Sequence, residues 1–166
     1  MSYTIQQHLT YSVWATERLK ETLEAVDEAI LFAETKSSFP SIAKTLLHAW
    51  DAEVIWLKRL QGISLDSWPS QNFKGGKKEL LEGIVQSAKN LAEFVESKGV
   101  GYLSTSVTYK NLKGDSFENQ VEDMLFHVVN HGTYHRGQVT TLLHQLGVTK
   151  IQSMDIIFYL RELNKS

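Results

Sequence analysis

The residues best suited to chemistry lie in residues 127–138, which read HVVNHGTYHRGQ and hold histidines at four-residue steps: His127, His131 and His135. On an α-helix a four-residue step rotates a side chain by only about 40° and rises about 6 Å, so His131 and His135 can direct their imidazoles to one point. Neutral imidazole is a common metal ligand. Taken alone, this spacing is more typical of exposed histidines or of hydrogen-bonded core histidines than of a metal site, because a metal site needs further ligands from elsewhere.

The same segment belongs to an apolar stripe with alternating steps of four and three, which predicts that His135 faces a bundle interior. A buried histidine needs partners for its ring nitrogens. Gly132 and Gly137 each cost a helix about 1 kcal/mol relative to alanine, which indicates a close approach of another backbone or of a ligand. The stripe consists of Val121, Leu125, Val128, Gly132, His135, Val139, Leu142 and Leu146.

A second stripe, in residues 40–61, contains one charged residue, Glu53. A carboxylate on a core stripe must be paired, protonated or bound to something. We interpret Glu53 as a catalytic general base or as a residue that orients a metal ligand, with a solvated face or an internal salt bridge as the alternative. For Asp51 we favour a solvated face or an internal salt bridge.

The third ligand could come from either of two histidines. His48 lies beside the stripe that holds Glu53 and could supply an imidazole from a different helix. His127 could instead be the third ligand, but it lies about 12 Å along the axis from His135, so one metal cannot bind His127, His131 and His135 together.

Several other site classes are excluded by their missing motifs. Gly132 follows His131, so the HExxH motif of zincins is absent, and no ExxH pair of a di-iron bundle occurs. No glycine-rich phosphate loop and no GxSxG elbow is present. The chain has no cysteine, which excludes disulfides, thiolate zinc sites and a cysteine nucleophile.

Composition predicts one domain, residues 1–166, with 42% hydrophobic and 22% charged residues. The net charge of −2 and the lack of a basic run argue against nucleic acid as a partner. The N-terminal segment lacks a signal-peptide pattern, and no apolar run is long enough to span a bilayer, so we expect a cytoplasmic protein with no membrane partner.

Hydrophobic periodicity predicts an all-α fold with four long helices. We expect helices over residues 3–26, 40–61, 77–97 and 116–146, a short final helix over 153–163, and a small hairpin over 104–117. Pro40 would lie in the first turn of the second helix, and Asp115 with Glu118 would form a capping box for the fourth. Residues 62–76 are long enough for a crossover. The small polar residues Ser12 and Thr16 in the first stripe indicate either a polar pocket or hydroxyls bonded to the preceding turn.

Three segments together resemble the DinB/YfiT-like family of four-helix-bundle metalloproteins, over nearly the whole chain. YSVWATERL (residues 11–19) resembles the N-terminal motif of the family, and HVVNHGTYHRGQVTTLLHQLG (residues 127–147) is close to its most specific signature. In the second helix, His48 followed by an acid five residues on and a tryptophan eight residues on fits the family pattern. The departures are Ser12 and Thr16, where asparagine is frequent in the family.

The resemblance implies a bundle with up-down-down-up order and a divalent metal held by His48, His131 and His135, with His127 left out of the ligand set. Zinc or nickel is expected first, with iron or manganese as alternatives. The resemblance also implies a homodimer and a metal-dependent hydrolase or a transferase that uses a low-molecular-weight thiol. A non-catalytic metal-binding or ligand-binding stress-response bundle is the alternative. Neither the resemblance nor the residues identify the small-molecule substrate.

Overall fold

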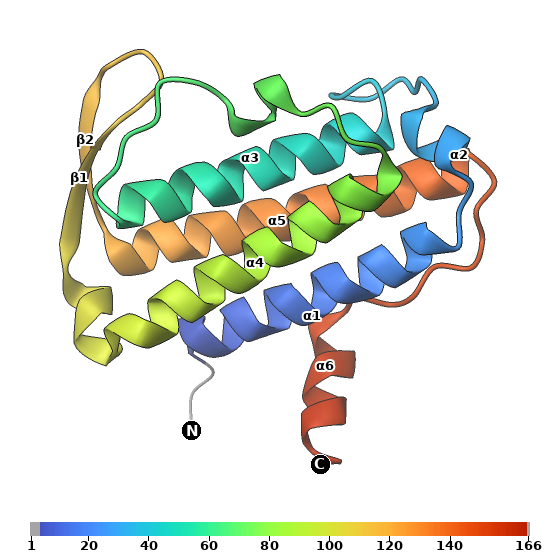
Figure 1. Ribbon diagram of the computed structural model, residues 1–166. Helices are drawn as coiled ribbons and strands as arrows, with labels where there is room; N and C mark the ends of the chain where they lie inside the picture. Colours follow the sequence, from blue (N-terminus) through green and yellow to red (C-terminus); the bar gives the residue numbers. More distant parts are fainter. Residues whose placement is uncertain (1–3, 166) are drawn as a thin grey trace.

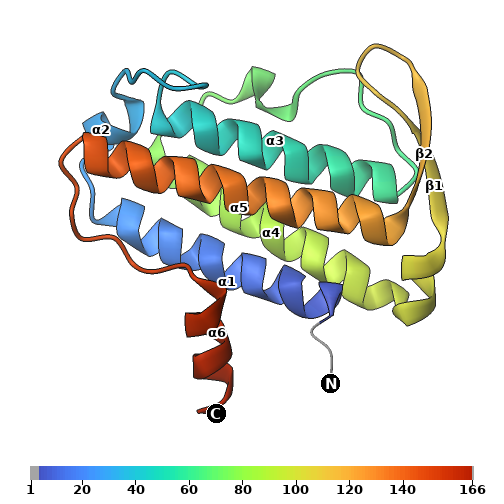
Figure 2. The same cartoon turned by 180° about the vertical axis from the view of Figure 1, so that it is seen from behind.

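The computed structural model describes residues 4–165 and is an all-α bundle of four long helices (Figure 1). These are α1 (Ile5–Glu24), α3 (Ile42–Leu60), α4 (Lys77–Lys98) and α5 (Val121–Gln145). Helices α1 and α5 run in one direction and α3 and α4 in the other, as Figures 1 and 2 show, so the expected up-down-down-up order is confirmed. Residue 3, the predicted start of the first helix, lies outside the described residues.

The parallel pair α3 and α4 requires a connection that returns along the bundle, and residues 61–76 provide it. This segment passes over α3 and includes the 3-10 turn η1 (Pro69–Asn72) (Figure 1). The short helix α2 (Glu28–Phe32) follows α1 in the sequence and packs near one end of the bundle. The predicted crossover is therefore confirmed, and it covers the helix that carries His48.

Helix α3 begins two residues later than predicted. Its N-cap is Ser41, whose hydroxyl accepts a hydrogen bond from the Lys44 backbone N–H at 3.1 Å. Pro40 consequently precedes the cap instead of occupying the first turn, so that prediction is wrong. A serine hydroxyl satisfies a free N–H of the first turn, which explains why the helix begins here.

A two-stranded antiparallel hairpin closes the other end of the bundle. Strand β1 (Ser106–Lys110) pairs with β2 (Ser116–Gln120), following a single-turn 3-10 helix, η2 (Val100–Ser104). The prediction of a hairpin is confirmed, but the capping box of Asp115 and Glu118 and a helix start near residue 116 are wrong. The Asn111 side-chain oxygen accepts hydrogen bonds from the backbone N–H groups of Lys113 and Asp115, and Gly114 has a φ of 91°. This turn directs residues 116–120 into the strand.

Two apolar clusters fill the bundle, one toward α2 and one toward the hairpin, and a polar layer separates them. The cluster toward α2 includes Leu19, Leu46 and Leu143, and the cluster toward the hairpin includes Leu9 and Val128. The buried polar residues of the middle layer are Ser12, Thr16, Ser87, His135 and Arg136. Burying a polar group costs free energy unless the group is hydrogen-bonded, so this layer is a candidate functional region.

Ser12 and Thr16 act within this layer in two ways. The Thr16 hydroxyl donates to the Ser12 carbonyl oxygen at 2.8 Å, which is the bond to the preceding turn. The Ser12 hydroxyl accepts from Arg136 Nη1 at 3.1 Å. Within residues 4–165, none of the helices combines the length and the apolarity needed to cross a lipid bilayer.

The last helix, α6 (Ile156–Leu163), projects away from the bundle (Figures 1 and 2). It begins three residues later than predicted, with Asp155 as its N-cap. Tyr159 is its one buried side chain, and the ring centroid of Tyr159 lies 5.8 Å from that of Tyr11 on α1. The helix is therefore anchored to α1 by an aromatic contact.

A test of the packing between α3 and α4 comes from Gly83. A Cβ at Gly83 would lie 2.4–2.8 Å from ring atoms of Trp50, closer than packed carbons can approach. Overpacking of this kind costs about 1–3 kcal/mol, which outweighs the gain of about 1 kcal/mol in helix propensity. We therefore expect Gly83→Ala to lower the free energy of unfolding by about 1–2 kcal/mol in urea titrations.

The matched control is Gly137→Ala on α5, where a Cβ would meet no atom within 4 Å. This variant should gain about 0.5–1 kcal/mol from helix propensity alone. Equal effects at both positions would contradict the close contact between Gly83 and Trp50. Among the described residues, the expected close approach of another backbone is absent at both glycines: a Cβ at Gly137 would meet no atom within 4 Å, and at Gly132 the nearest atom is Arg136 Nη1 of the same helix, at 3.2 Å. The alternative, a close approach of a ligand, stays a prediction.

Candidate metal centre

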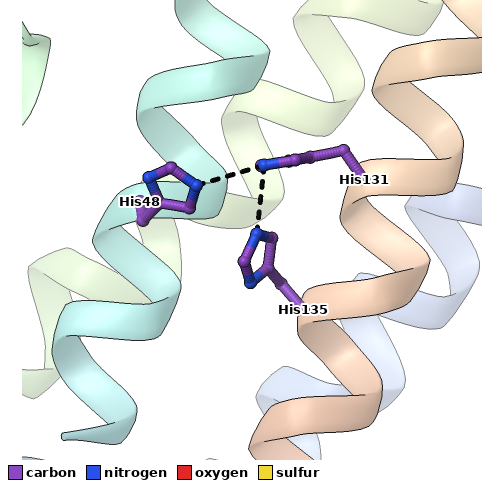
Figure 3. A group of neighbouring side chains, drawn as sticks. All are labelled: His48, His131 and His135. Atoms are coloured by element: carbon purple, nitrogen blue, oxygen red, sulfur yellow. Dashed lines mark hydrogen bonds between the residues drawn. The ribbon is translucent and has the colours of Figure 1, made fainter. Parts of the chain in front are cut away.

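Helices α3 and α5 bring three histidines to one point (Figure 3). Helix α5 places His131 and His135 one turn apart, and α3 presents His48 opposite them. His131 Nε2 lies 3.1 Å from His48 Nε2 and 3.0 Å from His135 Nε2. One ligand atom of each ring lies within 4.8 Å of the other two. The expected grouping of these histidines across the second and fourth helices is therefore present.

The donor set fits a divalent metal ion. A tetrahedral zinc with Zn–N bonds of 2.0–2.1 Å separates two of its nitrogen ligands by roughly 3.3 Å, which is close to the observed spacings. The third pair, between His48 and His135, lies within 4.8 Å. Three neutral imidazoles fill three positions and leave at least one for another ligand, which is the pattern of catalytic sites and not of closed structural ones.

Burial keeps these imidazoles in the neutral form that binds metal. The pKa of His131 is lowered to about 4, mainly by burial and in addition by the neighbouring His135, His48 and His127. Burial also lowers the pKa of His48 and of His135, although Asp51 and Gln138 respectively oppose the shift. At neutral pH the lone pairs are therefore free for coordination.

Gln138 fixes the orientation of the His135 ring. His135 Nδ1 lies 2.8 Å from the Gln138 side-chain oxygen, and because that oxygen can only accept, Nδ1 carries the proton and donates. This tautomer leaves the Nε2 lone pair directed at the other two histidines. Partners of this kind orient a ligand ring and increase its basicity.

We expect Gln138→Leu to lower the affinity for zinc by about 10–100-fold, as is typical for the loss of a hydrogen-bond partner of a metal ligand. The measurement is a competition titration with a chromophoric chelator. Gln145→Leu, the same change at an exposed position of α5, is the matched control and should leave the affinity unchanged. Equal affinities for wild type and Gln138→Leu would show that the hydrogen bond does not support the site.

A surface pocket of about 520 Å³ opens beside His48. The Phe39 ring stacks on His48 with centroids 4.5 Å apart, and Trp68 from the crossover lies 6.2 Å from it. Lys44 and Asp51 add charged groups to the pocket wall. This size and mixture of aromatic and charged walls suit a small molecule.

Asp51 has a different role from the one expected. It is buried, and its carboxylate accepts two hydrogen bonds from Ser70, from the backbone N–H at 2.7 Å and from the hydroxyl at 2.6 Å. It is therefore neither solvated nor in a salt bridge, and that prediction is wrong. The two bonds hold the crossover, with Trp68, against the helix that carries His48.

Glu53 does not join the three histidines. It lines an interior cavity of about 30 Å³, whose wall also includes His135 and Arg136. Burial raises the pKa of Glu53 to about 7, while Ser87 and Arg136 act in the opposite direction. The carboxyl can therefore exchange a proton near neutral pH, on the interior side of the three histidines.

Arg136 is a structural residue of the polar layer and not a surface residue. Its Nη1 donates to Ser12 Oγ and its Nη2 donates to Thr133 Oγ1 at 3.0 Å. The Tyr134 ring contacts His135, with the two ring centroids 5.1 Å apart. The sequence did not predict Phe39, Trp68 and Ser70 as site residues. They lie in connections between helices, where no periodicity indicates which way a side chain points.

His127 lies beside the site but outside it, as expected. Its ring centroid is 5.9 Å from that of His131 and 5.0 Å from that of Trp56. Its nitrogens are not among the grouped ligand atoms. Burial lowers its pKa, and the nearby Arg59 acts in the same direction.

Comparisons with known proteins agree on one family. The model of the DinB family matches residues 1–163. Protein DinB of Bacillus subtilis (strain 168) is 28% identical over 144 residues, which cover 82% of this chain and 83% of that protein. A crystal structure of a DinB-like protein from Bacillus cereus ATCC 10987 has a TM-score of 0.68 and 20% identity, covering 92% of this chain and 99% of the other. The similarity to this crystal structure supports the fold alone.

Proposed function

Because this chain belongs to the DinB family and brings three imidazoles to one point, we propose that it is a metal-dependent enzyme, either a hydrolase or a transferase that uses a small thiol as nucleophile. The metal ligands in this proposal are His48, His131 and His135. The observation that carries it is the convergence of three Nε2 atoms, with neighbouring pairs 3.0 and 3.1 Å apart, beside a pocket that reaches the surface.

When bound, the ion supplies Lewis acidity, which makes a water or thiol nucleophile more acidic and polarises a carbonyl group. Zinc and nickel are the first candidates, with iron and manganese as alternatives, because imidazole nitrogen binds all of them. The three histidines carry no charge, so they do not neutralise the ion and an anionic nucleophile is favoured. Phe39, Trp68 and Lys44 provide a wall against which a small substrate would bind.

Glu53 is the candidate proton acceptor in this proposal. Its pKa of about 7 suits proton exchange near neutral pH, and it lines the same small cavity as the metal ligand His135. Glu53 lies on the interior side of the three histidines and not in the open pocket. It would therefore exchange protons through the polar layer that includes His135 and Arg136. The homodimer and the cytoplasmic location stay predictions.

Cobalt substitution tests the open coordination position. Cobalt(II) in a three-histidine site gives visible absorption bands that change when an added ligand binds. We expect azide and 2-mercaptoethanol each to alter the spectrum saturably, with a sulfur-to-cobalt charge-transfer band for the thiol. A spectrum insensitive to both would indicate a sealed metal and favour the non-catalytic metal-binding bundle.

A further inference from the structure

Arg59, near the end of α3, is a buried cation with no anionic partner among residues 4–165. Its side chain is 9% exposed, and its Nε is buried without a hydrogen-bond partner. None of the ion pairs found within residues 4–165 involves Arg59. A guanidinium has five N–H donors and no acceptor, and leaving the buried Nε–H without a partner is costly.

Two aromatic rings fix the position of this guanidinium. Its Cζ lies 4.5 Å from the ring centroid of Trp56 and 4.5 Å from that of Tyr109 on β1. These two rings also contact each other edge to face, with an interplanar angle of 71° and centroids 5.4 Å apart. Cation–π contacts of this kind orient an arginine while leaving its N–H groups free to bind an oxyanion.

Arg59 lies on the same face of α3 as the metal ligand His48. The eleven helical steps from His48 to Arg59 rotate the helix by a net angle of only about 20° and rise about 16 Å. On α5, His127 continues the row from the metal site, since its ring contacts both His131 and Trp56. His127 is exposed, so a molecule bound at the metal can extend over it toward Arg59.

We propose that Arg59 binds a carboxylate or phosphate group of the molecule whose other end reaches the metal. This inference rests on the proposed function for the metal end, and it adds the substrate class: a small anionic molecule whose oxyanion lies roughly 10–15 Å from the reacting group. The alternative is that Arg59 only holds the hairpin against α3 through its ring contacts.

Two matched peptides distinguish these roles in the cobalt-loaded protein. N-acetyl-Cys-Gly-Gly-Glu amide and its Gln counterpart carry the same thiol, and their extended chains span the required distance at about 3.5 Å per residue. The charge-transfer band reports binding. We expect the Glu peptide to bind wild type about tenfold more tightly than the Gln peptide, as for one charge-assisted hydrogen-bonded pair.

In Arg59→Gln this preference should fall below about twofold, while the Gln peptide keeps its wild-type affinity. Arg59→Lys should keep part of the preference, because the charge remains but the planar fork is lost. Thermal melts of both variants establish that they are folded. Equal binding of the two peptides to wild type, or a preference that persists in Arg59→Gln, would overturn the inference.

Failure of the proposed function looks different. If cobalt binds but neither peptide produces a charge-transfer band, the open metal position is wrong, and the anion site is then decided without the metal. The Arg59 Nε–H resonance, assigned by its loss in Arg59→Gln, should shift saturably as inorganic phosphate is added. A resonance that does not move would overturn the anion site by itself.

Discussion

Replacing His135 by alanine is expected to lower the affinity for zinc by more than about 100-fold. The change removes one of three ligands, so the loss should exceed the 10–100-fold effect of losing an outer hydrogen-bond partner. Competition titration with a chelator measures it. Because metal stabilises only the folded chain, zinc at about 100 times its dissociation constant should add about 2.7 kcal/mol to the stability of wild type and almost nothing to that of the variant.

His127→Ala is the matched control for this prediction. It removes an imidazole from the same helix, and that imidazole contacts His131 but lies outside the group of ligand atoms. Its zinc affinity should stay within about threefold of wild type. If both variants lost affinity equally, the ligand set would have to include His127, and His48 would have to be re-examined by the same titration.

Replacing Glu53 by glutamine should remove a pH dependence of stability worth up to about 3 kcal/mol. The pKa of Glu53 is raised from 4.5 to about 7 in the folded chain, mainly by burial, and each pKa unit corresponds to about 1.4 kcal/mol. Between these two values the folded chain holds a proton that the unfolded chain has released. Stability therefore falls as pH rises through this window, and the loss is complete above about pH 7.

The measurement is urea unfolding of the metal-free protein at several pH values between 4 and 8. The Gln variant has no proton to lose, so its stability relative to wild type should increase by up to about 3 kcal/mol over this range. The histidines titrate in both proteins and cancel in the difference. Glu17→Gln is the control, because Glu17 forms a surface ion pair with Lys89 and should change stability by less than about 1 kcal/mol. Parallel pH profiles for wild type and Glu53→Gln would contradict the raised pKa.

The long helices could be predicted because their burial is periodic. Each of the four helices carries an apolar stripe, and the observed bounds differ from the predicted ones by a few residues. The exception is the start of α5, where Asp115 and Glu118 imitate a capping box although Asn111 closes a hairpin turn. A local capping pattern cannot reveal that residues 116–120 have a strand partner, because the pairing is with residues distant in the chain.

The candidate site could be predicted only in part, for a similar reason. Helical spacing alone brings His131 and His135 together, but the choice of His48 as the third member depends on how α3 packs against α5, and it came from the family resemblance. Glu53 was recognised as anomalous, and the structure places it in the interior cavity instead of beside the open pocket. No functional role was predicted for Arg59, because an arginine near a helix end is common. Only the structure shows its two ring contacts.

The most direct measurement is the metal content of the wild-type protein, purified without a nickel column and analysed by inductively coupled plasma mass spectrometry before and after reconstitution. A site formed by His48, His131 and His135 predicts one divalent metal per chain. Absence of stoichiometric metal, even after incubation with zinc, nickel, iron and manganese, would contradict the metal centre and reduce the three histidines to hydrogen-bonded residues of a helical bundle.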